Sequence, residues 1–368
     1  MKLRNCRIDE AIIAFSNKKI VFFGKGSWLK SIEYTDLMLM QDRFLYIIDN
    51  NPIGEVKMGD RCLQVYMPEK LKNERNIVVV ISSSIYMYDM YIQLMDMNLD
   101  DSIECYVFPF MQKVTKRKSD FSIDFRSGEK KIPRIIHSFW FSGDDKNELY
   151  QQCRDSWDKY LDGYEIKEWN MINYNWHKNK FMEKAIEHKT WAFASDYARL
   201  DVLYTYGGIY LDMDVEVCRS FDDLLSNDAI FSFSNNIMVD LAVLGASKGN
   251  MLIKKLLDLY EEIEPPENRN GFSRFFQPSF IRSLLASNGV EMNGSLQKIE
   301  NATFFPHEFF MPLDYVLYDE DSRNENTYCI HHDNFGWSNG KEDKKKKKIR
   351  DNMILWKMIN QCYGENDK

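Results

Sequence analysis

The chain has 368 residues, which is long enough for two domains with separate hydrophobic cores. Its composition, 44% hydrophobic and 28% charged, is that of an ordinary soluble globular protein. The formal net charge of -8 argues against general nucleic-acid binding, which needs a broadly basic surface.

The cysteines and the N-terminal segment indicate the cellular compartment of the protein. The 7 cysteines lie far apart and form no C-x-x-C pair, so neither a disulfide framework nor a zinc site is expected. The first residues, MKLRNCRIDEAIIAF, carry acidic side chains where a signal peptide has its apolar core, and no run of about 18 apolar residues occurs. We therefore expect a cytoplasmic protein.

Residues 1–120 are predicted to form a Rossmann-like α/β domain. Residues 19–23, 44–48 and 77–81 are short apolar runs typical of buried strands. The first run is followed by Gly24-Lys25-Gly26 and by a helix that begins near Ser27. Alternation of strand and helix in this order predicts a parallel sheet.

The glycine turn raises the question of nucleotide binding by this domain. Asp49 lies about twenty positions after the turn, as in a dinucleotide-binding fingerprint. Leu29 stands where the third glycine of that fingerprint should be. The pattern therefore favours a scaffold for docking or assembly over a nucleotide site.

Residues 121–131 are predicted to be a linker, because the stretch from Lys113 to Lys131 is charged and poor in large apolar residues. A second α/β domain is expected over residues 132–368. It opens with a strand whose sequence is I-P-R-I-I-H-S-F-W-F. Within this strand, His137 is interpreted as a buried structural histidine rather than a ligand.

The most informative segment runs from residue 191 to residue 216 and begins as a helix. Ser195 is a candidate N-cap, and Asp196 and Arg199 are spaced to share one face of the first turn. Apolar residues continue at helical spacing until Gly207-Gly208, which is expected to end the helix.

A short strand and two carboxylates follow the glycines. Residues 209–211 are strand formers that lead directly into Asp212 and Asp214. On a strand, side chains two positions apart point to the same side. Two hard oxygen ligands at a strand end suit Mg²⁺ or Mn²⁺, which leaves coordination places open for phosphate oxygens.

The whole segment resembles the DXD region of sugar-binding-region glycosyltransferases. These are the family 32-like enzymes related to yeast initiating mannosyltransferases, bacterial capsular transferases and, more distantly, large clostridial toxins. The opening strand is similar to the I-P-K-I-I-H-x-x-W-F start of that family's catalytic domain. The resemblance implies a GT-A type fold for residues 132–368 and a usually Mn²⁺-dependent, retaining mechanism.

The resemblance also implies roles on the nucleotide side of a donor. Trp140 would stack on the base, and Tyr210 would lie near the ribose. Asp212 would reach the ribose, and the metal through water. Ser195 belongs to the same expected nucleotide-sugar-binding set.

On the sugar side, the resemblance assigns Asp196 and Arg199 to the sugar hydroxyls and the diphosphate, and Asp214 to direct metal ligation. Together with Asp212, these are the expected catalytic residues. His331 and Trp337 keep the spacing of the family's closing H-h-x-x-x-S-W motif, with His331 as a third metal ligand.

Two departures from the family pattern stand in this part of the chain. Gly336 replaces the usual serine of the closing motif, which leaves His332 or Asp333 as alternative ligands. Phe276-Gln277-Pro278 replaces a T-G-P sequence in a loop that commonly lines the sugar or acceptor side, so the identity of the sugar cannot be transferred from the family.

A basic run, Lys344–Lys348, precedes apolar residues at roughly helical intervals near the C-terminus. Such a helix can lie on an anionic membrane surface, which would make the protein peripheral to the inner face of the cytoplasmic membrane. The alternative, which we favour, is a solvated charge run before a helix that packs on the catalytic domain.

The sequence thus predicts a metal-dependent, retaining glycosyltransferase. It would move a sugar from a UDP- or GDP-sugar to a carbohydrate or lipid-linked glycan acceptor, in capsular or other surface polysaccharide synthesis. Two other classes stay open: a toxin-like transferase that modifies a protein, and a catalytically inactive protein that binds a nucleotide-sugar or glycan.

Overall fold

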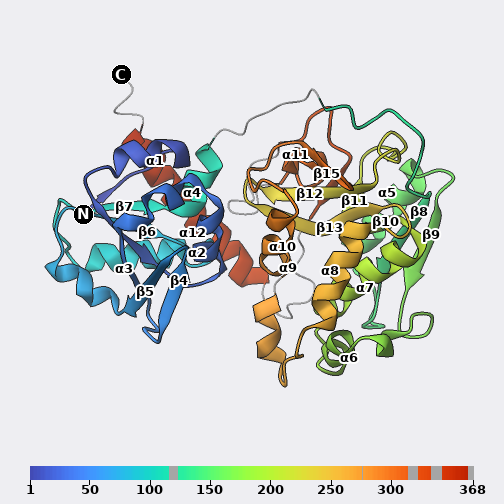
Figure 1. Ribbon diagram of the computed structural model, residues 1–368, viewed down its shortest axis with the longest axis horizontal. Helices are drawn as coiled ribbons and strands as arrows, with labels where there is room; N and C mark the ends of the chain where they lie inside the picture. The colour runs from blue at the N-terminus through green and yellow to red at the C-terminus, as the bar shows by residue number, and fades with distance from the viewer. Residues whose placement is uncertain (116–122, 276, 314–321, 333–341, 364–368) are drawn as a thin grey trace. The chain divides into compact units, whose positions relative to one another are not determined.

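In the computed structural model, the described residues are 1–115, 123–275, 277–313, 322–332 and 342–363. They form two compact α/β units (Figure 1). The first unit contains residues 1–115 and 342–363, and the second contains the remaining described residues. The predicted α/β fold class is confirmed.

The first unit is built on a seven-stranded sheet in the order β1-β7-β6-β2-β3-β5-β4. All neighbouring strands are parallel except β4 and β5. The central strands are continuous apolar runs because helices cover both faces of a parallel sheet. The strands are β1 (Lys2–Leu3), β2 (Lys19–Phe23), β3 (Phe44–Ile48), β4 (Glu55–Met58), β5 (Arg61–Tyr66), β6 (Ile77–Ile81) and β7 (Glu104–Val107).

The helices of this unit connect the strands in the alternating order expected for such a sheet. They are α1 (Ile8–Ala14), α2 (Ser27–Ser31), α3 (Met87–Asp96) and α4 (Phe108–Val114), with short 3₁₀ segments η1 (Ile32–Tyr34), η2 (Asp36–Arg43) and η3 (Pro68–Asn73). The prediction of a Rossmann-like parallel sheet is therefore confirmed.

Helix α12 (Glu342–Tyr363) packs on the first unit, although the sequence analysis assigned it to the second. Leu355 and Ile359 are fully buried, and the Trp356 ring lies 4.9 Å from that of Phe110. The Asn352 amide donates to the backbone carbonyl of Ser84 at 3.3 Å. An amphipathic pattern shows that a helix face is buried but not against which partner.

The same packing bears on the basic run at the start of α12. The apolar face that a membrane contact would need is already used within the first unit. The packing therefore agrees with a helix that packs on the protein, although on the first unit rather than the second. None of the helices in the described part of the chain is long and apolar enough to cross a membrane.

The predicted linker is also shorter than expected, because residues 123–131 pack on the second unit. Phe125 is only 8% exposed, and its ring contacts those of Phe305 and Phe309 at 4.9 and 5.8 Å. The Asn227 amide donates to the Phe125 carbonyl at 2.9 Å. One buried aromatic residue anchors a stretch whose composition is otherwise that of a linker.

The second unit contains a mixed seven-stranded sheet in the order β14-β15-β12-β13-β10-β8-β9. Strands β8, β9 and β10 are mutually parallel, whereas β13 runs antiparallel to its neighbours β10 and β12. The strands are β8 (Ile135–Phe139), β9 (Glu165–Trp169), β10 (Gly208–Leu211), β12 (Ala229–Asn235), β13 (Met238–Ala246), β14 (Gln297–Ile299) and β15 (Ala302–Phe305). A separate two-stranded sheet pairs β11 (Val215–Val217) with β16 (Cys329–His331).

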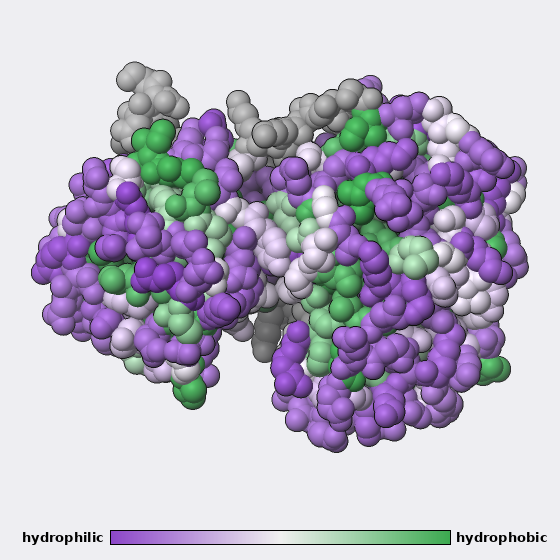
Figure 2. All heavy atoms as spheres, viewed as in Figure 1, coloured by the Kyte–Doolittle hydropathy of each residue, from purple (hydrophilic) through white to green (hydrophobic). Residues whose placement is uncertain are grey.

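Helices complete the second unit, some of them against the mixed sheet and others against neighbouring helices or the two-stranded sheet (Figure 1). They are α5 (Glu148–Tyr160), α6 (Lys180–Glu187), α7 (Trp191–Tyr206), α8 (Met251–Glu261), α9 (Gln277–Phe280), α10 (Arg282–Ser287) and α11 (His307–Phe310), with 3₁₀ segments η4 (Trp176–Lys178) and η5 (Arg269–Phe275). The face drawn in Figure 2 is mostly hydrophilic on both units, with small apolar patches. Most of the large apolar side chains in the described residues are buried.

Candidate metal and donor site

Two glycines join the helix of the D-x-D segment to its strand. Gly207 is the C-cap of helix α7, and β10 begins at Gly208. Their φ angles are 69° and 115°, respectively. A Cβ at Gly208 would lie 2.6 Å from the carbonyl oxygen of Ile135 and 3.0 Å from Nε2 of His137. Only glycine allows β10 to begin this close to β8 in this conformation.

The D-x-D turn follows β10 and leads into β11. The Asp212 amide donates to the carbonyl of Ala242 at 2.9 Å, which anchors the turn to β13. Strand β16 pairs with β11 so that His331 lies opposite Val215. This pairing brings an imidazole from more than a hundred residues away to the two carboxylates.

Asp212, Asp214 and His331 form one cluster at the end of β10. One potential ligand atom from each lies within 4.8 Å of the others, and all three residues are partly buried. The distance between His331 Nε2 and Asp214 Oδ1 is 3.4 Å. Two carboxylate oxygens and an imidazole nitrogen fit a divalent cation.

The electrostatics of the cluster agree with a cation site. Burial raises the pKa of Asp212, and the charge of Asp214 raises it further, although Arg199 partly opposes both effects. A divalent cation would stabilise both carboxylates in their ionised forms. The residues present therefore fit the metal that the D-x-D pattern implies.

Arg199 lies 5% exposed beside the cluster, and its guanidinium is engaged by protein groups. Its Nη2 lies 3.1 Å from Asp196 Oδ1 and 3.4 Å from Asp212 Oδ1. Its Nε donates to the Ser195 carbonyl at 3.1 Å, and its Nη1 donates to the Leu241 carbonyl at 2.8 Å. In this arrangement Arg199 holds the two carboxylates in place.

Tyr210 supports the same network from β10. Its hydroxyl donates to Asp212 Oδ1, and its ring lies 4.5 Å from the guanidinium carbon of Arg199. Burial would lower the pKa of Arg199, but the Asp212 carboxylate and its neighbours outweigh burial, so that the pKa is raised. The guanidinium therefore stays charged.

Asp196 is the buried acid of the network, with 8% of its surface exposed. Burial raises its pKa to about 7; the charge of Arg199 opposes the rise, and the charges of Asp212 and Asp240 add to it. The Gln277 amide donates to the backbone carbonyl of Asp196 at 3.2 Å. The loop that departs from the family pattern thus contacts this part of the site.

Ser195 does not cap the helix, contrary to the sequence prediction. Helix α7 begins at Trp191, with Thr190 at the N-cap position, so Ser195 lies within the helix. Its hydroxyl donates to the Ala192 carbonyl at 2.8 Å and lies 3.3 Å from Arg199 Nη2. Asp196 and Arg199 therefore lie one turn later in the helix than expected.

Trp140 follows β8 directly and is partly buried. Its Nε1 donates to the Asp144 carbonyl at 2.8 Å, and its ring meets that of Tyr150 edge to face at 5.2 Å. Because β8 and β10 are parallel neighbours, Trp140 and Asp212 lie at the same edge of the sheet. Trp337 and Asp333 lie outside the described residues.

The two other histidines of these segments have different partners. His332 lies 3.0 Å from Glu216 through its Nε2, and its amide donates to the Asp214 carbonyl at 3.0 Å. His137 is fully buried, with its Nε2 2.9 Å from the Gly207 carbonyl, and it accepts a hydrogen bond from Trp169 Nε1 at its Nδ1. Its surroundings are those of a structural histidine, as expected.

Sequence reasoning missed Asp240, a partly exposed residue of β13 whose charge acts on both Asp196 and Arg199. The sequence feature that could have indicated Asp240 is a single carboxylate within the apolar run M-V-D-L-A-V-L-G. A single acid in a strand is too common to identify a site by itself.

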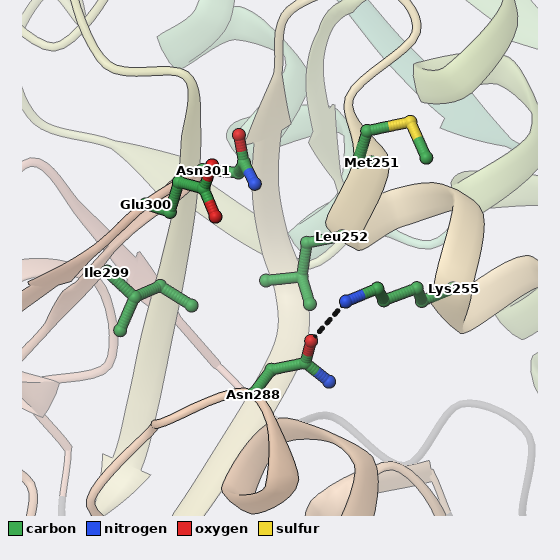
Figure 3. Close-up of a pocket in the computed structure, with 7 residues that line it drawn as sticks. All are labelled: Met251, Leu252, Lys255, Asn288, Ile299, Glu300 and Asn301. Atoms are coloured by element: carbon green, nitrogen blue, oxygen red, sulfur yellow. Dashed lines mark hydrogen bonds between the residues drawn. The ribbon is translucent and has the colours of Figure 1, made fainter.

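A separate small hollow lies near the start of α8 (Figure 3). Lys255 donates to the Asn288 side-chain oxygen across it. None of the predicted site residues lines this hollow, so it is distinct from the D-x-D cluster. Its lining residues are Met251, Leu252, Lys255, Asn288, Ile299, Glu300 and Asn301.

Comparison with known proteins identifies the central part of the chain. Residues 144–231 match the family model of the glycosyltransferase sugar-binding region containing the DXD motif. The chain contains a DXD-type glycosyltransferase region. This DXD region includes α7, β10, Asp212 and Asp214.

Individual relatives are more distant. An uncharacterized glycosyltransferase of Acanthamoeba polyphaga mimivirus is 32% identical over 111 residues, which cover 27% of this chain and 43% of that protein. The chain thus spans less than half the length of this curated relative.

Two solved structures show low similarity. The PaToxG glycosyltransferase is 19% identical, with a TM-score of 0.34 over 42% of this chain and 69% of its own. A glycosyltransferase involved in the glycosylation of the major capsid of PBCV-1 is 10% identical, with a TM-score of 0.31 over 58% of this chain and 98% of its own.

Proposed function

We propose that the protein is a metal-dependent, retaining glycosyltransferase that uses a nucleotide-sugar donor. The observation that carries the proposal is the cluster of Asp212, Asp214 and His331 beside the buried Arg199. Both aspartates belong to the matched DXD region. A UDP- or GDP-sugar presents a diphosphate that a cation held by this cluster would bind.

Different residues of the chain would bind different parts of the donor. Trp140, at the same sheet edge as the D-x-D turn, would stack on the base through its partly exposed ring. Tyr210 donates to Asp212 Oδ1, and the two residues would lie near the ribose. Asp196 and Arg199 would lie beside the sugar. Arg199 would orient the carboxylates of Asp196 and Asp212 through its ion pairs with them.

When bound, the cation supplies Lewis-acid stabilisation of the negative charge on the departing diphosphate. Asp214 and His331 would hold it, together with Asp212, whose Oδ1 is oriented by Arg199 and Tyr210. Retention of the anomeric configuration is the outcome that the family resemblance implies. The anomeric configuration of the product, determined by NMR, tests this part, and an inverted linkage would refute it.

The metal assignment is tested by Asp214→Ala. We expect this variant to lose Mn²⁺ binding in isothermal titration calorimetry and to lose Mn²⁺-dependent sugar transfer or donor hydrolysis. Asp258→Ala is the control, because Asp258 is an exposed carboxylate that pairs with Lys254 on α8. Near-normal turnover of Asp214→Ala in Mn²⁺ would place the metal elsewhere.

The acceptor we propose is a carbohydrate or lipid-linked glycan, as in capsular or other surface polysaccharide synthesis. Radiolabelled donor incubated with glycan and protein acceptors separates this activity from a toxin-like modification of proteins. Incorporation into protein alone would contradict the polysaccharide role. Donor binding without transfer or hydrolysis would indicate a binding protein.

A further inference from the structure

Asp240 lies in a part of β13 that holds the D-x-D site in place. The residue after it, Leu241, accepts a hydrogen bond from Arg199 Nη1 at 2.8 Å. The next residue, Ala242, accepts one from the Asp212 amide at 2.9 Å. Asp240 itself accepts from the Ala242 amide at 2.8 Å through Oδ1. Leu241 and Ala242 therefore contact the candidate site, and Asp240 is bonded to Ala242 directly before them.

Asp240 lies at an irregular part of β13, next to the residues that contact the D-x-D turn. Leu211 pairs with Val243 across the antiparallel strands β10 and β13, so Asp212 follows opposite Ala242. Strand β13 bulges beside this position, because its pairing with β12 shifts from Gly245 opposite Ile230 to Asp240 opposite Ser232. Asp240 is partly exposed, whereas its neighbours Val239, Leu241 and Ala242 are buried.

The charge of Asp240 acts on the sugar side of the site. Its carboxylate adds to the rise in the pKa of Asp196 and to that of Arg199. Arg199, however, forms its ion pairs with Asp196 and Asp212. Within the described part of the chain, Asp240 has no ion pair of its own.

Neither the electrostatics nor the hydrogen bonding of the protein itself explains why residue 240 is a charged aspartate. A carboxylate at this position adds negative charge beside Asp196 and Asp212, which is unfavourable for ionised neighbours. The bond to the Ala242 amide uses only Oδ1, and a neutral side chain such as asparagine could accept the same bond. An acceptor for a ligand donor explains why the charged group is there.

We propose that Asp240 binds a hydroxyl group of the transferred sugar through its second carboxylate oxygen, Oδ2. The inference depends on the proposed function, since it assigns one further residue to the donor. Sugar hydroxyls are hydrogen-bond donors, and a carboxylate acceptor makes hydrogen bonds about twice as strong as neutral ones. Asp240 then determines affinity for the sugar, whereas the cation and its ligands determine affinity for the diphosphate.

The test compares binding of a nucleotide-sugar with binding of the same nucleotide lacking the sugar. Isothermal titration calorimetry in Mn²⁺ uses UDP-glucose, UDP-galactose, UDP-N-acetylglucosamine and GDP-mannose, with UDP and GDP as the sugar-free probes. We expect Asp240→Ala to weaken the best nucleotide-sugar by about tenfold to a hundredfold, the loss of one hydrogen bond to a charged group. Binding of UDP or GDP should stay within about twofold of wild type.

Asp240→Asn is the matched variant, because its amide oxygen can still accept from the Ala242 amide. We expect it to lose less affinity than Asp240→Ala. Asp258→Asn, an exposed carboxylate change on α8, is the control and should bind all probes as wild type does.

The outcomes separate this inference from the proposed function. If wild type binds a nucleotide-sugar and Asp240→Ala binds it equally well, the role of Asp240 is refuted and the proposed function stands. Equal losses for the nucleotide-sugar and the free nucleotide would also refute it, because they indicate a structural role. If wild type binds no probe, the proposed function fails and the inference fails with it.

Discussion

His137 shows how a single buried side chain is fixed in one protonation state. Trp169 donates to its Nδ1, so the proton of the neutral ring is on Nε2, which donates to the Gly207 carbonyl. Burial lowers the pKa of His137 to about 4, an effect that the bond to Gly207 only partly offsets. The pKa of a histidine in an unfolded chain is about 6.5.

This lowered pKa predicts a pH dependence of stability. Between pH 6.5 and 4 the unfolded chain binds a proton at His137 and the folded chain does not, so acid favours unfolding. The stabilising contribution is complete above pH 6.5 and decreases by about 3 kcal/mol as the pH falls to 4.

The measurement is urea unfolding followed by tryptophan fluorescence in wild type and His137→Gln. Glutamine can accept from Trp169 and donate to Gly207 without titrating. We expect the difference in unfolding free energy between the two proteins to shift in favour of the variant as the pH falls through this range. A difference that stays constant from pH 7 to 4 would show that His137 does not titrate in this way.

The residues of the candidate site illustrate what a sequence does and does not specify. The D-x-D spacing predicted that Asp212 and Asp214 lie together, and the structure groups them with His331, because the strand and the two glycines limit their geometry to a few arrangements. The guanidinium of Arg199 was expected to face the donor, whereas its protein contacts are with Ser195, Leu241 and two carboxylates. Contacts to backbone carbonyls of a distant strand leave no pattern in the sequence.

At the scale of elements, the junction of α7 and β10 controls where the D-x-D turn begins. Gly208→Ala places a Cβ 2.6 Å from a backbone oxygen of β8 at a φ of 115°, and backbone cannot move away as a flexible side chain can. We expect a loss of about 3 kcal/mol in unfolding free energy and weaker Mn²⁺ binding, because β10 is displaced from β8.

Gly249→Ala is the matched control. Gly249 also has a positive φ, 73°, but nothing lies within 4 Å of the added Cβ. Conformational strain alone costs about 1 to 2 kcal/mol there, and Mn²⁺ affinity should not change. Chemical denaturation and calorimetry report both quantities; equal effects of the two substitutions would refute the steric argument.

Elements with a continuous apolar run were predictable from the sequence. Strands β2, β3 and β6 have the predicted bounds, since each is a five-residue run in a parallel sheet that is apolar apart from Lys19 at the start of β2. Strand β16 was not assigned, because it has only three residues and is defined by its pairing with β11. Such a strand forms through a distant partner, which local composition does not show.

At the scale of the whole chain, the first unit is discontinuous in sequence, because α12 follows the second unit. Leu355→Asp introduces a charge at a fully buried position of α12 and should destabilise the first unit by at least about 3 kcal/mol. Ile354→Asp changes the neighbouring residue, which is 41% exposed, and should be nearly neutral.

Hydrogen exchange read out by mass spectrometry locates the effect. We expect Leu355→Asp to reduce protection of β2 and β6 and to leave β10 and β13 unchanged. Retained Mn²⁺ affinity would show that the second unit is intact. Loss of protection confined to the second unit would contradict the assignment of α12 to the first.

This discontinuity also imposes an order on synthesis. The ribosome completes all strands of the first sheet, then the whole of the second unit, and only afterwards the helix that covers part of the first. Apolar side chains of the nascent first unit, such as Phe110, therefore lack their partners on α12 while some two hundred residues are synthesised. This takes about 10 to 40 s at the usual rate of translation. We expect chaperones to bind the nascent chain during that interval, because α12 follows the second unit in the sequence.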